Sequence, residues 1–191
     1  MSYFVVKHNE NAAVWAGSPD VSVLTAGFIA SKHGTAQFNI SGLRSQGSED
    51  THWFWPSLVL SHGDQIDIAY LADGQQTEPA TTRVVPRRSI QEMLSELRSR
   101  SEAVRSSVSS PPRIVSAVRS HRLTVLTAFS SQVEATIGVS EYLQAVVCLA
   151  QGQCKIEVDS LTVQSDGSTR GRRWLAEPLS LGESVSLTYA A

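Results

Sequence analysis

The chain has 191 residues, of which 41% are hydrophobic and 18% charged, and its formal net charge at pH 7 is −2. This composition is typical of a globular protein and excludes a disordered or collagen-like chain. No apolar stretch approaches the roughly 20 residues that a membrane-spanning helix requires, so no membrane partner is expected. The first residues lack a basic segment followed by an apolar one, so we expect no secretory signal and a cytoplasmic location.

The clearest pattern in the sequence is an approximate internal repeat. Residues 23–26 (Val-Leu-Thr-Ala) recur as residues 125–128, and residues 55–70 match residues 174–189 in outline. Each longer segment contains a Trp, then a Gly-acid pair, then alternating apolar residues that end on a Tyr. The pattern predicts a tandem duplication that yields two related antiparallel β units. Positions present in only one copy are the better candidates for function.

Residues 1–86 are expected to form the first β unit. Residues 21–30, 36–40 and 65–70 are rich in β-forming residues, and the last two segments alternate apolar with polar side chains. This period of two is typical of half-buried antiparallel strands. Turn signals that contain glycine separate the segments. We therefore predict a small sandwich or open barrel.

Residues 87–112 are expected to form a helical bridge between the two units. Apolar residues recur at helical spacing from residue 90 to residue 108, and Ser89-x-x-Glu92 has the form of a capping box. The prolines of Ser-Ser-Pro-Pro at 109–112 would end the helix. The sequence thus predicts an amphipathic helix at 89–108 that packs against the β units or against a second molecule. A structural homo-oligomer formed through this helix is an alternative.

Residues 113–191 are expected to form the second β unit, with an insertion near 129–155. Within it, residues 140–150 contain Leu, Gln and Ala, which favour a short buried helix, although Val146 and Val147 leave a strand open. The predicted fold class is therefore α+β, mainly β: two related antiparallel β units joined by an amphipathic helix, with a short helical insertion in the second unit.

Basic residues are concentrated in the middle of the chain. Residues 87–122 carry 8 basic and 3 acidic side chains, whereas residues 1–86 carry 4 and 8. This segregation favours a basic bridge that docks onto acidic neighbours. A nucleic-acid partner is disfavoured because the pI is about 6.2 and no aromatic residues are interleaved with the arginines.

Cys148 and Cys154 are the two cysteines of the chain. A disulfide between them would close a very short loop, so we favour reduced thiols. Because neither cysteine has a nearby histidine, we predict no metal or other cofactor.

The segment at residues 48–56 distinguishes the first copy from the second. It reads Ser-Glu-Asp-Thr-His-Trp-Phe-Trp-Pro, whereas its counterpart at residues 172–174 is Arg-Arg-Trp. On a strand, one side of this segment would be strongly aromatic. Aromatic side chains beside acidic ones make good interface anchors, although structural packing of the segment is the alternative. The predicted binding surface consists of Glu49, Asp50, His52 and Trp53.

An enzymatic alternative can be drawn from His52, His62 and Asp64, because histidine titrates near neutral pH and binds metals. The chain has no Gly-rich phosphate loop, no G-x-S-x-G elbow, no H-E-x-x-H and no paired Cys-x-x-Cys. We therefore predict no catalytic residues. A hydrolase or metal-dependent enzyme that uses these histidines and nearby carboxylates stays the alternative.

A resemblance to other proteins rests on three segments of the first copy. They are residues 40–43 (Ile-Ser-Gly-Leu), 49–53 (Glu-Asp-Thr-His-Trp) and 58–68 (Leu-Val-Leu-Ser-His-Gly-Asp-Gln-Ile-Asp-Ile). This pattern of Gly-Leu, Trp and Gly-Asp-x-Ile-x-Ile resembles small uncharacterised bacterial proteins, some of which are similar to immunity proteins of toxin systems. The second copy departs from it, since Gly-Leu becomes Ser160-Leu161. Duplication without a catalytic constellation, together with the aromatic and acidic segment of the first copy, predicts a bacterial protein-binding module that recognises or masks another protein through its first β unit. The resemblance implies that this module is immunity-like.

Overall fold

The structure is a computed structural model that describes residues 2–31, 35–87, 121–128, 132–137, 142–163 and 168–190. The regular elements of these residues are β-strands. The first half of the chain supplies β1 (Tyr3–His8), β2 (Val14–Gly17), β3 (Val23–Ser31), β4 (Ala36–Gln46), β5 (Glu49–Phe54), β6 (Leu58–Leu60), β7 (Gln65–Leu71) and β8 (Thr81–Pro86). The second half supplies β9 (His121–Thr127), β10 (Gln132–Ile137), β11 (Tyr142–Ala150), β12 (Gln153–Val163), β13 (Thr169–Leu179) and β14 (Ser184–Ala190).

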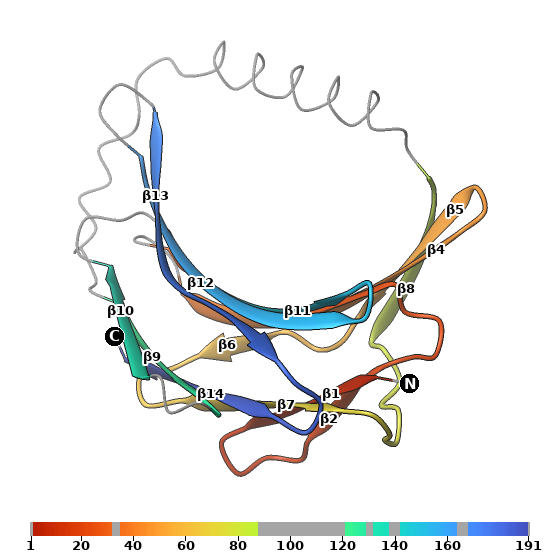
Figure 1. Cartoon of the computed structure of the whole chain (residues 1–191), viewed down its shortest axis with the longest axis horizontal. Helices are drawn as coiled ribbons and strands as arrows, with labels where there is room; N and C mark the ends of the chain where they lie inside the picture. Colours follow the sequence, from red (N-terminus) through yellow and green to blue (C-terminus); the bar gives the residue numbers. More distant parts are fainter. Residues whose placement is uncertain are drawn as a thin grey trace.

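The strands form two antiparallel sheets that pack face to face as a β-sandwich (Figure 1). Sheet A has the order β10-β9-β14-β7-β1-β2. Sheet B has the order β13-β12-β11-β3-β4-β5-β8, and β6 also pairs with β4. Sheet B is curved, so that its convex face covers sheet A and its concave face points away from it (Figure 1). Both sheets contain strands from both halves of the chain.

The hydrophobic core lies between the sheets because apolar residues occupy alternate positions of the paired strands. Phe28 and Phe38 of sheet B are almost fully buried, as are Ile66, Ile68 and Leu187 of sheet A. The buried residues of the two halves form one continuous cluster. The halves therefore share a single core.

An approximate two-fold relation links the two halves. In sheet A, β7 is the neighbour of β14, and Asp67 pairs with Ser186, which lies 119 positions later. In sheet B, β3 is the neighbour of β11, and Gly27 pairs with Val146, again 119 positions later. The same shift relates β1 to β9 and β2 to β10, and a shift of 118 positions relates β4 to β12.

The turns that lead into β7 and β14 follow this two-fold relation. The Gly63 N–H donates to the Tyr189 carbonyl at 2.9 Å, and the Gly182 N–H donates to the Tyr70 carbonyl at 2.7 Å. The two glycines have φ values of 89° and 91°. Side chains other than glycine rarely adopt this backbone conformation, which explains why the Gly-acid pair occurs at both places.

The expected helix at residues 140–150 is wrong, because the structure has strand β11 there. Leu143, Ala145, Val147 and Leu149 are buried against sheet A, and the residues between them are only partly exposed. A strand in the middle of a sheet has neighbouring strands on both sides and few charged side chains. Its amino-acid composition can therefore resemble that of a buried helix. Tertiary pairing with β3 and β12 outweighs the helix propensity of Leu, Gln and Ala.

The predicted α+β class with two β units is also wrong. Both sheets take strands from both halves, and the described residues contain strands as their only regular elements. The similarity between residues 23–26 and 125–128 does not reflect equivalent positions in the fold. Residues 23–26 lie on β3 of sheet B, whereas residues 125–127 lie on β9 of sheet A.

The predicted helix at 89–108 lies outside the described residues. The part of the chain that the structure describes has no helix long and apolar enough to cross a membrane.

Candidate functional site

Strand β5 carries the residues predicted to form a binding surface. It lies between β4 and β8, and His52 pairs with Arg83 of β8. Because side chains alternate along a strand, Asp50 and His52 face one side of sheet B, whereas Glu49 and Trp53 face the other. The structure therefore does not bring the four predicted residues onto one face.

The concave side of β5 presents an aromatic pair. The rings of His52 and Phe54 are stacked, with centroids 6.3 Å apart and an interplanar angle of 7°. Phe54 is 42% exposed, which is unusual for a phenylalanine on a folded protein. Arg83 lies across from His52 on β8. An apolar ring is thus displayed beside a cationic side chain.

Trp53 lies on the convex side, where it contributes to packing. It contacts the hydrophobic core, and the Arg44 guanidinium carbon lies 5.6 Å from its ring centroid. A Cβ at Gly42 would lie 3.4 Å from the rings of both Trp53 and Trp55. This is an ordinary van der Waals distance, so both indoles pack directly over Gly42. Trp55 is buried, and its Nε1–H donates to the Thr77 carbonyl at 2.9 Å.

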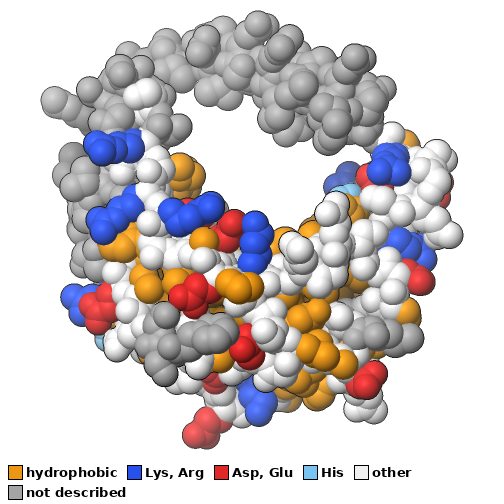
Figure 2. Space-filling view, viewed as in Figure 1, with side chains coloured by type: hydrophobic (Ala, Val, Ile, Leu, Met, Phe, Trp, Pro, Cys, Tyr) orange, Lys and Arg blue, Asp and Glu red, His pale blue; other side chains and the backbone are white. Residues whose placement is uncertain are grey.

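The concave face of sheet B is hollowed (Figure 2). It consists of the side chains that alternate with core residues and point away from sheet A. Charged side chains gather toward the β12–β13 side of the hollow (Figure 2). Across the strands the concave face includes Thr25, Asn39, Ser41, Asp50, His52, Phe54, Arg83, Gln144, Val146, Lys155, Glu157, Asp159 and Arg173.

The second-half part of the concave face is a ladder of ion pairs. Lys155 Nζ lies 2.8 Å from Glu157 Oε1, and Arg173 Nη1 lies 3.5 Å from the same oxygen. Arg173 Nε donates to Asp159 Oδ1 at 2.9 Å. This hydrogen bond, with the charges of Asp159 and Glu157, raises the pKa of the Arg173 guanidinium. The charges of the ladder largely satisfy one another.

The two halves of the concave face differ chemically at equivalent positions. Glu157 and Asp159 take the places of Asn39 and Ser41, and Arg173 takes the place of Phe54. The first half is therefore uncharged and aromatic where the second half is charged. Sequence reasoning missed the ladder, although the alternation Lys-x-Glu-x-Asp from residue 155 to residue 159 was a signal for one charged strand face.

The enzymatic alternative receives no support from the geometry. His62 is exposed in the turn before β7, whereas His52 lies on β5. Asp64 is instead bound to His8, with Oδ2 3.1 Å from His8 Nε2, and to Asn9, whose Nδ2 donates to Oδ1 at 2.9 Å. Within the described ranges, no three His, Cys, Asp or Glu side chains are placed to hold a metal ion. Asp64 therefore ties two turns together.

Asp64 gives the fold a pH-dependent contribution. Burial raises the pKa of its carboxyl. The opposing effects are larger, so that the pKa is lowered: the carboxylate accepts hydrogen bonds from the Ser61 N–H and from the side chains of Asn9 and His8, and it is attracted by the charge of His8. Because the pKa is lower in the folded chain, the stabilisation is present above about pH 5 and is lost as the pH falls below about 4.

We expect Asp64→Asn to lower the free energy of unfolding by about 1 kcal/mol at pH 7. At pH 3, below the ordinary pKa of an aspartate carboxyl, the unfolded chain binds a proton at this position, so the difference between the two proteins should shrink. Urea unfolding of both proteins at each pH measures it. A difference that stays constant between pH 7 and pH 3 would contradict this account.

Comparisons with protein-family models, with curated proteins and with solved structures find no match to this chain. Function must therefore be inferred from the geometry of the chain's own residues. The concave face and the edges of sheet B are the surfaces on which that inference rests.

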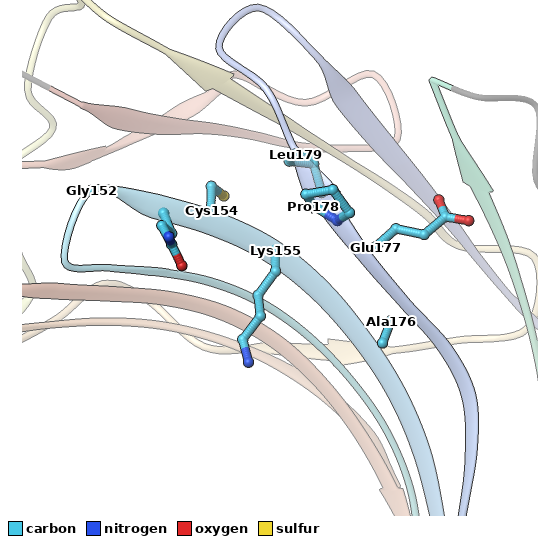
Figure 3. A pocket seen from close by; sticks show the side chains of 8 residues that line it. Gly152, Cys154, Lys155, Ala176, Glu177, Pro178 and Leu179 are labelled. Atoms are coloured by element: carbon cyan, nitrogen blue, oxygen red, sulfur yellow. The ribbon is translucent and has the colours of Figure 1, made fainter.

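A pocket of about 470 Å³ lies beside the β11–β12 turn, between the start of β12 and the end of β13 (Figure 3). Cys154, Lys155 and Glu177 are among its lining residues, and Glu177 Oε2 accepts a hydrogen bond from Thr127 Oγ1 at 2.9 Å. Both cysteines are free thiols. Burial and the neighbouring Cys148 raise the pKa of Cys154 to about 12, so it stays protonated and is a poor nucleophile.

Proposed function

We propose that this protein binds a partner protein through the first-half part of its concave face, and that it recognises or masks that partner as an immunity-like protein of the bacterial cytoplasm. The observation that carries the proposal is the exposed stacked pair of His52 and Phe54. Aromatic residues are enriched among the side chains that dominate binding energy, because each buries a large area with few rotatable bonds.

The surroundings of the aromatic pair suit a protein partner. Arg83 lies beside His52, and Asp50 points to the same side one alternation earlier on β5. Charges around an apolar anchor orient a partner and raise the rate of association. Trp53 and Glu49 face the opposite side, so we assign Trp53 the supporting role of fixing β5 against the core.

The internal two-fold relation identifies Phe54 as a position at which the two halves differ. We propose that the two halves derive from a tandem duplication, since their strands are related by shifts of 119 or 118 positions. Where the halves share a residue type, the position serves the fold. Where they differ, as at Phe54 and Arg173, the position is free to serve binding.

The test compares matched variants on the two halves. The partner is first captured from the native host and purified, and its affinity is then measured by calorimetry for the wild type, for His52→Ala/Phe54→Ala and for Arg173→Ala. We expect the first-half variant to bind at least 10-fold more weakly, which corresponds to about 1.4 kcal/mol or more. Arg173→Ala should bind like the wild type.

Thermal unfolding of all three proteins is the control, because His52 and Phe54 lie outside the core and their removal should leave the melting temperature nearly unchanged. Equal affinities of the wild type and the first-half variant would refute the proposed surface. A loss confined to Arg173→Ala would instead place binding on the ion-pair ladder.

A further inference from the structure

We propose a second docking site on the outer edge of β13, where an extended acidic segment of a partner protein adds a strand to sheet B. β13 is the terminal strand of this sheet. The site lies on the second half of the chain and is separate from the aromatic pair. It does not depend on the function proposed above.

The first half shows how such an edge is completed. β8 pairs antiparallel with the outer edge of β5, from Glu49 opposite Pro86 to Phe54 opposite Thr81. The shift of 119 positions places residues 169–173 of β13 where residues 50–54 of β5 lie. Among the residues that the structure describes, no strand pairs with this edge of β13. Within the described ranges, β5 thus has a completed edge, and the equivalent edge of β13 has no neighbouring strand.

The available stretch on β13 is short and well defined. A register shift interrupts the β12–β13 ladder between Val158 and Asp159, next to Trp174, and Pro178 lacks a backbone donor. Bulges and prolines protect the edges of natural sheets from unwanted pairing. They leave residues 169–173 as the regular part, which is close to the length that β8 covers on β5.

The charges on this stretch specify the partner. Arg170 and Arg172 are exposed on one side of β13, whereas Arg173 on the other side is held by Asp159 and Glu157. The guanidinium carbon of Arg172 lies 3.6 Å from the ring centroid of Trp174, which holds the charge beside the edge. Opposite charges on neighbouring strands stabilise their pairing. A partner strand with glutamate or aspartate at alternate positions therefore fits this edge.

The same charges disfavour a second copy of this chain as the occupant. Of the two terminal strands of the described sheet B, β8 carries Arg83 and β13 carries its own arginines. Pairing β13 with either strand of another copy would place like charges opposite each other, which destabilises a sheet. Addition of a foreign strand is a common mode of peptide recognition, in which the backbone supplies affinity and the side chains supply specificity.

The test uses the full-length protein and three nine-residue peptides, each labelled with a fluorophore. The first alternates glutamate with valine, the second has lysine in place of each glutamate, and the third is the glutamate peptide with alternate backbone amides methylated. We expect fluorescence anisotropy to show at least 10-fold tighter binding of the glutamate peptide than of either other peptide. Amide hydrogen exchange should show new protection in β13 on binding.

Variants of the protein separate this edge from other basic surfaces. Arg170→Glu/Arg172→Glu should reverse the preference in favour of the lysine peptide, and Arg170→Glu alone, which leaves Arg172 on Trp174, should weaken the glutamate peptide. Lys7→Glu on β1 of sheet A, where the basic side chain is likewise exposed, is the matched control and should leave the affinities of both peptides unchanged.

Three results would overturn the proposal. The first is that the glutamate peptide does not bind at millimolar concentration, or binds no better than the lysine peptide. The second is evidence of charge attraction without strand addition. Either of two observations would provide it: the methylated peptide binds as well as the unmodified one, or an oligonucleotide competes for the same arginines more strongly than the peptide. The third is protection of the outer β13 amides in the free protein, which would show that the edge is already covered.

Discussion

Replacing Trp55 with alanine is expected to lower the free energy of unfolding by about 3–5 kcal/mol. Its side chain is only 2% exposed and fills space between the sheets at the end of β5. Its Nε1–H also donates to the Thr77 carbonyl at 2.9 Å, and this carbonyl would lose its partner in the variant. The cavity accounts for most of the cost, because the hydrogen bond to Thr77 lies at a partly buried place where water can replace it.

Trp174 is the matched control, because it occurs at the equivalent place 119 positions later in the sequence. It is only partly buried, with Arg172 over its ring and its Nε1–H donating to Ser160 Oγ at 2.9 Å. We expect Trp174→Ala to cost about 1–2 kcal/mol. Urea unfolding of both variants measures the difference. Equal losses would refute the conclusion that Trp55 contributes more to the core than Trp174 does.

Replacing Tyr189 with phenylalanine is expected to lower the free energy of unfolding by about 1–3 kcal/mol, although it removes a single oxygen atom. The Tyr189 hydroxyl lies 2.7 Å from Nδ1 of His121, and His121 is 1% exposed. The two rings are stacked with centroids 5.8 Å apart. Loss of the hydroxyl leaves a buried polar nitrogen without this contact, and burial makes that loss costly.

Tyr70 is the equivalent residue in the first half and provides the control. Its hydroxyl lies 3.3 Å from Ser2 Oγ at a partly buried place, so water can replace the contact. Tyr70→Phe should therefore cost less than about 0.5 kcal/mol. Thermal unfolding of both variants, with His121→Phe/Tyr189→Phe as a third, measures the pair. If the double variant is less stable than Tyr189→Phe alone, the histidine is stabilised by contacts other than the tyrosine.

Strict alternation made several strands predictable from the sequence. The segment at residues 65–70 was expected as a half-buried strand and forms β7, and residues 36–40 form the start of β4. β11 could not be recognised in the same way, because Val146 and Cys148 on its second face are also apolar. Its side chains alternate between buried and partly exposed only in the folded sheet, where β3 and β12 lie on either side of it.

The candidate site was predictable in part. The alternation at residues 49–54 indicated that His52 and Phe54 would face away from Trp53, but it could not show which side was the core. That assignment depends on the packing of sheet A against the convex face. The ladder of Lys155, Glu157, Asp159 and Arg173 required the pairing of β12 with β13, which local sequence does not specify. The edge of β13 required the full strand order.

The pairing of β3 with β11 and of β7 with β14 delays completion of both sheets during synthesis on the ribosome. When residues 1–87 have emerged, all of β1–β8 has been made, yet β3 and β7 each lack one neighbour until residues 142–190 follow. For that interval the nascent chain displays two unpaired apolar strand edges, which are sites for association with other nascent chains. Contacts between residues so distant in sequence also slow folding. The first half therefore depends on the timely arrival of the second, and conditions that slow translation between them should favour aggregation over folding.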